Sequence, residues 1–156
     1  MTRRAAFNAD EWAAVVDAPV YAALRVIAAS HGGRLRESLA LSRAYQDARA
    51  HHGESELLDE LVKSPPAIDA DELRHAQSNI GEVATQQLHD AVGFVAAKAT
   101  PAEADSYKKF VMGVAQTVAA AHKEGGFLGI GGKQITDAED HALDEISTAL
   151  GPPPPT

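Results

Sequence analysis

The residues best suited to chemistry are the carboxylates of the last predicted helix. Asp137, Asp140 and Asp144 lie close together in the sequence. Because Asp140 and Asp144 are four residues apart, they share a helix face and could hold a hard divalent cation through oxygen ligands. Acidic residues early in a helix also complement its dipole, and the others can form a solvated face. We expect the solvated face, and metal binding is the alternative.

A glycine-rich segment precedes this helix. Residues 123–133 read KEGGFLGIGGK and contain five of the chain's 12 glycines. Three interpretations stay open. Phe127, Leu128 and Ile130 could form an exposed turn that contacts a partner or a membrane surface. The glycine amides could form an anion-binding nest, or the apolar side chains could fold back to close one end of the core. The segment lacks the Ser or Thr that follows Gly-Lys in a phosphate-binding loop.

Other candidates for catalysis or metal binding are sparse. His75, Glu82 and His89 recur every seven residues, so they lie along one side of a helix. Their spacing of about 10 Å along a helix is too wide for one metal ion. We expect this row to be exposed, or to form a polar seam in an oligomer. The chain has no cysteine, and serines such as Ser38, Ser42 and Ser106 fall inside predicted helices. We therefore predict no catalytic residue and no cofactor, with a weak alternative of one divalent cation.

Start and stop signals divide the chain into about seven predicted helices. Capping boxes begin at Asn8, Asp69, Thr100 and Thr136, each with a Glu three residues later. Pro19 is expected to end the first helix and to begin the second. No segment alternates apolar and polar residues as a strand does. The predicted helices are 8–18, 19–30, 35–50, 54–63, 70–99, 101–122 and 136–150.

Length and composition indicate one all-α domain, a compact bundle spanning 1–151, with a proline-rich disordered tail at 152–156. A length of 156 residues is typical of a single domain. The formal net charge of −8 argues against nucleic-acid binding, which needs a basic surface. No apolar run is long enough to span a bilayer. We expect a soluble cytoplasmic protein, either a monomer or a homodimer.

The two halves echo each other weakly. In each, an alanine-rich helix end is followed by a glycine turn and a helix that opens with Glu, around 28–37 and 119–139. Two pseudo-repeated helical hairpins would produce this pattern. Any alanine-rich helical protein can also show it by chance, so both interpretations stay open.

Residues 131–139, GGKQITDAE, followed by Leu143, Ile146 and Leu150, resemble the turn-and-helix signature of tellurite-resistance TerB-like proteins. The chain also resembles a group of bacterial proteins that carry a KEGGFLG-GG segment before the last helix. The resemblance implies a compact all-α fold of this length. In the TerB-like family, acidic residues at the turns would support divalent-cation binding. Here Gly131 and Gly32 replace the turn aspartates, and only Glu37 and Glu139 align with acidic positions.

Together these observations predict a non-enzymatic interaction or stress-associated module of bacterial type. Its unknown protein partner is expected to contact Phe127, Leu128 and Ile130 and the neighbouring acidic helix start. A divalent-metal-binding protein that uses the carboxylates of the last helix is the alternative. An enzyme whose site lies between helices is a third option.

Overall fold

The computed structural model describes residues 4–29, 43–50, 56–63, 79–124 and 137–151. Within these ranges the chain forms six helices and no strand, so the predicted all-α bundle is confirmed. A short 3-10 helix, η1 (Arg4–Ala6), precedes them. The helices are α1 (Ala9–Ala29), a helical segment at 43–50, α3 (Glu56–Lys63), α5 (Ile80–Lys98), α6 (Pro101–Glu124) and α7 (Asp137–Leu150).

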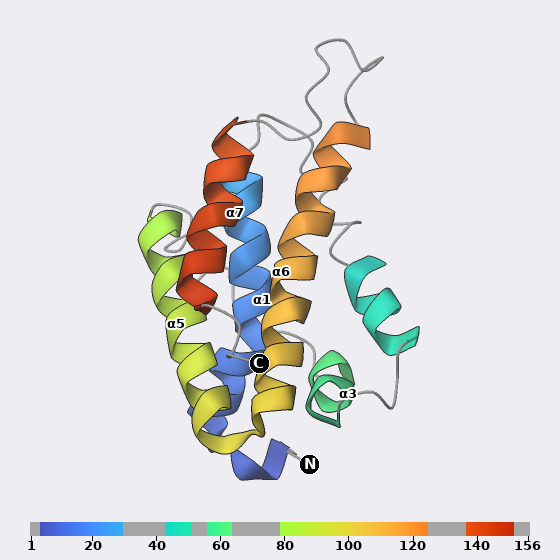
Figure 1. The fold of residues 1–156 in the computed structure, drawn as a ribbon, viewed down its shortest axis with the longest axis vertical. Helices are drawn as coiled ribbons and strands as arrows, with labels where there is room; N and C mark the ends of the chain where they lie inside the picture. The colour runs from blue at the N-terminus through green and yellow to red at the C-terminus, as the bar shows by residue number, and fades with distance from the viewer. Residues whose placement is uncertain (1–3, 30–42, 51–55, 64–78, 125–136, 152–156) are drawn as a thin grey trace.

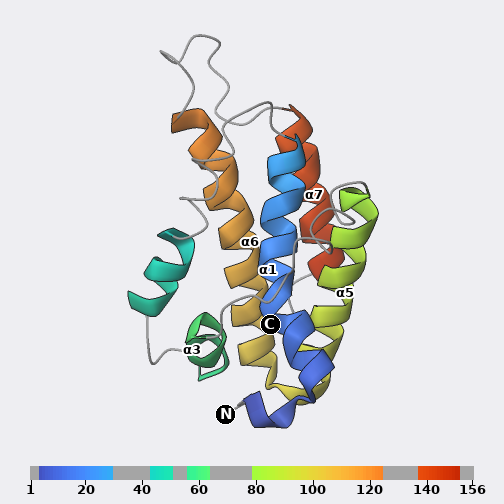
Figure 2. The same cartoon turned by 180° about the vertical axis from the view of Figure 1, so that it is seen from behind.

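Helix α1 runs through the middle of the bundle (Figures 1 and 2). Helices α5 and α7 pack on one side of it and α6 on the other, and all three contact α1. Helices α1 and α6 run in one direction, whereas α5 and α7 run in the opposite direction. The segment 43–50 and α3 lie beyond α6. Arg49 links these two short helices, because its guanidinium donates to the Val62 carbonyl at 3.1 Å and 3.3 Å.

The N-terminus of α1 is fixed by the predicted capping box. The amide N–H of Glu11 donates to Asn8 Oδ1 at 2.8 Å, and the N–H of Asn8 donates to Glu11 Oε2 at 2.9 Å. Lys98, the last residue of α5, also donates to Glu11 Oε2 and lies 5.8 Å from the centre of the Phe7 ring. The cap therefore joins the start of α1 to the end of α5.

Helix α1 continues through Pro19, so the prediction that this proline ends the first helix is wrong. The helix is 21 residues long and joins the predicted segments 8–18 and 19–30, which reduces about seven helices to six in the described part of the chain. A proline inside a helix has no N–H to donate to the carbonyl four residues earlier, here that of Val15. Pro19 and Val15 are both buried, so this carbonyl is also shielded from water.

Tyr107 of α6 supplies the missing hydrogen bond. Its hydroxyl donates to the Val15 carbonyl at 2.8 Å, across 92 positions of sequence. Burial is the main cause that raises the pKa of Tyr107 well above its usual value of 10.0, with Tyr45 and Asp17 as smaller causes. The hydroxyl therefore keeps the proton that it donates. A tertiary contact thus satisfies the carbonyl that proline would leave without a donor.

Three apolar side chains in the second half of α1 are only half-buried. Val20, Leu24 and Ile27 keep intermediate exposure. The buried residues on this part of the helix are mostly smaller: Ala18, Tyr21, Ala22, Ala23 and Val26. Because α1 is surrounded by three helices, its alanine-rich side allows the close approach that larger side chains would prevent.

Helix α5 is shorter than the predicted helix 70–99. It begins at Ile80, and Asn79 before it has non-helical backbone angles, with φ −139° and ψ 42°. Asparagine favours such helix boundaries and turns because its short polar side chain competes with the helical backbone. The predicted start at Asp69 lies outside the described residues. The 19 residues of α5 correspond to about 28 Å, instead of about 45 Å for the predicted helix.

The predictions for the remaining helices are largely confirmed. At the start of α6, the N–H of Glu103 donates to Thr100 Oγ1 at 3.2 Å. Helix α7 buries Ala142, Leu143, Ile146 and Leu150. Gly151 ends α7 in the left-handed conformation with φ +84°, as glycine does after many helices. The glycine-rich loop, the turn at 30–34, the cap at Thr136 and the tail 152–156 lie outside the described residues.

Candidate functional site

A groove of about 700 Å³ lies between α5 and α7. Its lining alternates small side chains with polar ones and comes entirely from these two helices. Six of the lining residues are exposed, and Gly81, Glu145 and Ala149 are half-buried, so the groove is shallow and open to solvent. The lining residues are Gly81, Thr85, Gln86, His89, His141, Asp144, Glu145, Thr148 and Ala149.

The packing of the two helices fixes which side chains line the groove. On α5, Gly81, Thr85 and His89 are four residues apart and form one row along the helix. The adjacent side of α5 is anchored in the core by Ala84, Leu88, Ala91 and Val95. Helix α7 buries its own apolar stripe and exposes the row that begins at His141. The groove therefore lies between the exposed row of α5 and the exposed row of α7. The buried faces of the two helices fix the positions of both rows.

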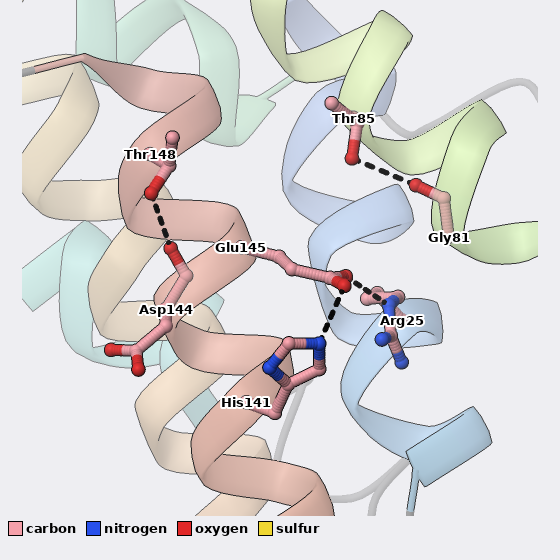
Figure 3. A network of polar contacts seen from close by, with 7 residues as sticks. All are labelled: Arg25, Gly81, Thr85, His141, Asp144, Glu145 and Thr148. Atoms are coloured by element: carbon pink, nitrogen blue, oxygen red, sulfur yellow. Dashed lines mark hydrogen bonds and ion pairs between the residues drawn. The ribbon is translucent and has the colours of Figure 1, made fainter.

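One network of charged side chains ties α7 to α1 beside the groove (Figure 3). Arg25 Nε donates to Glu145 Oε2 at 2.8 Å, and His141 Nε2 lies 3.0 Å from Glu145 Oε1. The Arg25 side chain is only 16 % exposed, whereas the His141 side chain is 70 % exposed. Arg25 thus neutralises Glu145 from the protein side, and His141 contacts it from the solvent side.

The two threonine hydroxyls of the groove are bonded to their own helices. Thr85 Oγ1 donates to the Gly81 carbonyl at 2.7 Å, and Thr148 Oγ1 donates to the Asp144 carbonyl at 2.9 Å. Figure 3 shows both bonds. A hydroxyl nucleophile needs a base within hydrogen-bond reach of its proton. Here each proton points to a carbonyl, so neither hydroxyl is set up for attack on a substrate.

Asp144 lies at the outer rim of the groove. In Figure 3 its carboxylate points away from the Arg25–Glu145 pair. Among the described residues, no side chain pairs with this carboxylate. On α5, Gln86 Nε2 donates to Asp90 Oδ1 at 2.8 Å. Because Arg25 balances Glu145, Asp144 is the uncompensated charge among the lining residues at neutral pH, with histidine counted as neutral.

Two of the three predicted metal candidates, Asp140 and Asp144, have side chains in the described part of α7. Asp140 and Asp144 are both exposed on α7, and only Asp144 lines the groove. The described residues contain no group of three or more His, Asp or Glu side chains arranged to hold a metal ion. The side chain of Asp137 lies outside the described part, so a metal site that includes it stays a prediction.

The other predicted site residues have mixed outcomes. Phe127, Leu128 and Ile130 lie outside the described residues, and partner contact through them stays a prediction. His75 is also outside. Glu82 and His89 are exposed on α5, as predicted for their row, and His89 lines the groove.

Sequence reasoning missed Arg25, Thr85 and Thr148 as residues at or beside this site. The contact between His141 and Glu145, by contrast, lies within one helix. That relation depends only on the four-residue spacing within one helix. The contribution of Arg25 has no such local signal, because 120 positions separate it from Glu145.

Comparison of the chain with protein-family models, with curated proteins and with solved structures gives no match. The resemblance of residues 131–139 to TerB-like proteins therefore stays a prediction. Among the described residues, no helix combines the length and the apolar character needed to cross a membrane. The groove between α5 and α7 is the feature from which a function can be argued.

Proposed function

We propose that this protein is a non-enzymatic interaction module that binds a protein partner along the groove between α5 and α7. The observation that supports this proposal is the groove itself, about 700 Å³ in volume and lined by residues of two helices. Its volume is within the range of ligand sites, roughly 300–1,000 Å³. Its lining is mainly exposed, however, whereas a small-molecule pocket encloses most of its ligand. A shallow groove of this kind suits a segment of another protein.

The hydrogen bonds in the groove favour binding over catalysis. The Thr85 and Thr148 protons are held by backbone carbonyls, and Arg25 compensates the charge of Glu145. A general base must reach the proton of a reacting group, and a nucleophile must be activated by such a base. The rows on α5 and α7 instead offer fixed polar atoms and small side chains, which position a bound chain.

The glycine-rich loop extends the proposed contact surface. This loop joins α6 to α7, and His141 follows the start of α7 by about one turn. A partner in the groove would therefore be near the end from which the loop departs. Phe127, Leu128 and Ile130 are proposed to supply the apolar part of the contact, as aromatic and aliphatic side chains do in many interfaces.

Position-dependent crosslinking tests this proposal. A photoreactive residue would replace Thr148 in the groove, Leu128 in the loop or Lys109 on α6, whose side chain is 77 % exposed. In cells that make the protein, we expect one discrete protein adduct from positions 148 and 128, and none from 109. Equal adducts at all three positions, or none at 148, would contradict the proposal.

A groove-filling variant provides the matched control. Thr85→Trp places a bulky side chain in the groove at an exposed position, and Gln116→Trp makes a similar change on an exposed position of α6. Thr85→Trp should abolish the adduct formed at position 148, and Gln116→Trp should not. Circular dichroism should show that both variants keep their helical content.

A further inference from the structure

We infer that the segment bound between α5 and α7 is basic, with arginine or lysine side chains that donate hydrogen bonds into the groove. This inference rests on the proposed function and adds the chemistry of the partner. It depends on which lining side chains already donate their protons within the protein, and on the negative charge of Asp144 that is left unpaired.

The threonines present only acceptors to a ligand. A hydroxyl has one proton to donate and two lone pairs that accept. Thr85 donates its proton to Gly81 O, and Thr148 donates its proton to Asp144 O. Both oxygens can therefore accept a hydrogen bond from a bound segment, but neither can donate one without first breaking a bond within its helix.

The α7 row also presents acceptors. At 3.0 Å from a Glu145 oxygen, His141 Nε2 must carry the proton that joins them. In the neutral imidazole, Nδ1 is then a bare acceptor. The carboxylates of Asp144 and Glu145 accept only. Figure 3 shows these groups along the same stretch of α7.

The lining residues offer few hydrogen-bond donors to a ligand. Arg25 Nε is bonded to Glu145, and Arg25 is not among the lining residues. The amide of Gln86 donates one proton to Asp90 and has one left. His89 contributes a ring N–H at the end of the α5 row. A phosphate or carboxylate ligand would therefore meet few free donors and the unpaired charge of Asp144.

Arginine and lysine match this surface in both charge and hydrogen-bond polarity. Each side chain donates hydrogen bonds and accepts none. Each also carries a positive charge, which would pair with the Asp144 carboxylate. Their aliphatic stems can pack on the small groove residues Gly81 and Ala149 while the charged ends reach the carboxylates. The net charge of −8 on the whole chain would also attract a basic segment at long range.

Peptide titration followed by amide chemical shifts tests the inference. The probes are three peptides of equal length that alternate glycine with arginine, with citrulline or with glutamate. Citrulline keeps the shape of arginine and several of its donors but has no charge. The arginine peptide should shift the amides of 81–89 and 141–149, the citrulline peptide should bind more weakly at the same place, and the glutamate peptide should not bind there.

Two variants that differ by position alone separate groove binding from general attraction. Asp144→Asn removes the rim carboxylate, and Asp140→Asn makes the same change on an exposed residue of α7 that does not line the groove. Asp144→Asn should weaken the arginine peptide about three-fold, the effect of one exposed ion pair. Asp140→Asn should change the binding free energy of the arginine peptide by less than half as much as Asp144→Asn does.

Three outcomes would overturn the inference. Equal weakening by both variants, with shifts scattered over other acidic surfaces, would mean non-specific attraction. Tighter binding of the glutamate peptide in the groove would mean that the partner is acidic. Failure of the arginine peptide to bind, while the crosslink at position 148 persists, would reject a basic partner and leave the interaction module intact.

Discussion

Polar groups find their hydrogen-bond partners in opposite ways at two places in the molecule, the contact between α1 and α6 and the groove between α5 and α7. At the first, the Val15 carbonyl is buried and has one donor, the Tyr107 hydroxyl from the neighbouring helix. At the second, the hydroxyls of Thr85 and Thr148 bond within their own helices and leave acceptors facing solvent. The buried polar bond joins two helices, whereas the local bonds leave a surface open. This comparison shows where the fold is fixed and where a partner can bind.

Removal of the buried hydroxyl should have the largest effect on stability. Tyr107→Phe leaves the Val15 carbonyl buried without a donor, which should lower the free energy of unfolding by about 1–3 kcal/mol. Chemical denaturation with a two-state fit measures this change. Tyr45→Phe is the matched control, because the Tyr45 hydroxyl is buried with no hydrogen-bond partner in the described structure. That variant should be neutral or stabilising, since an unsatisfied hydroxyl is removed.

A double-mutant cycle with Pro19 tests the reason for this effect. Pro19→Ala restores an N–H that can donate to the Val15 carbonyl within α1, as in an ordinary helix. Tyr107→Phe should then cost clearly less in the Pro19→Ala background than in the original protein. Equal costs in the two backgrounds, or an equal loss from Tyr45→Phe, would show that Tyr107 does not compensate for the proline.

The charged network beside the groove should have a smaller effect. Glu145→Gln leaves the largely buried Arg25 without its carboxylate, and we expect a loss of about 1 kcal/mol, at the upper end for a partly exposed ion pair. Asp144→Asn should change stability by no more than about 0.5 kcal/mol, as for most surface substitutions. Thermal and chemical unfolding of the two variants measure this difference. If Asp144→Asn were the more destabilising, the rim carboxylate would be part of the fold and not of a free surface.

The features that sequence analysis predicted correctly depend on residues close in the chain. The capping boxes at Asn8 and Thr100 follow from a three-residue spacing. The all-α class follows from many such local signals, summed over the chain.

The incorrect or missing features depend on contacts distant in the chain. Pro19 has every local mark of a helix end, and the stabilising contact comes from Tyr107. The groove exists because α5 and α7 are neighbours, and Arg25 reaches Glu145 across 120 positions. Periodicity shows which side of a helix is apolar, but it does not show which other helix covers that side. The site therefore had to be found from the structure.

The smallest expected effect lies at the contact between Lys98 of α5 and the capping box of α1. The hydrogen bond from Lys98 is the largest cause that lowers the pKa of Glu11 below its usual value of 4.5, and the Asn8 backbone N–H is the second. A carboxyl whose pKa is lowered by folding stabilises the protein above its unfolded pKa. This contribution is lost as the pH falls through the folded pKa, because the unfolded state then binds the proton more readily.

The pH dependence of unfolding therefore tests the contact between α1 and α5. In the original protein, the free energy of unfolding should fall below pH 4.5. Glu11 contributes part of this fall, and Glu11→Gln should remove that part. Lys98→Met should remove most of the same contribution, because it deletes the strongest partner of Glu11. Lys109→Met, which removes a lysine from an exposed pair with Asp105 on α6, should leave it in place. If Lys109→Met reduced the loss of stability at low pH as much as Lys98→Met, the effect would come from net charge and not from the contact between Lys98 and Glu11.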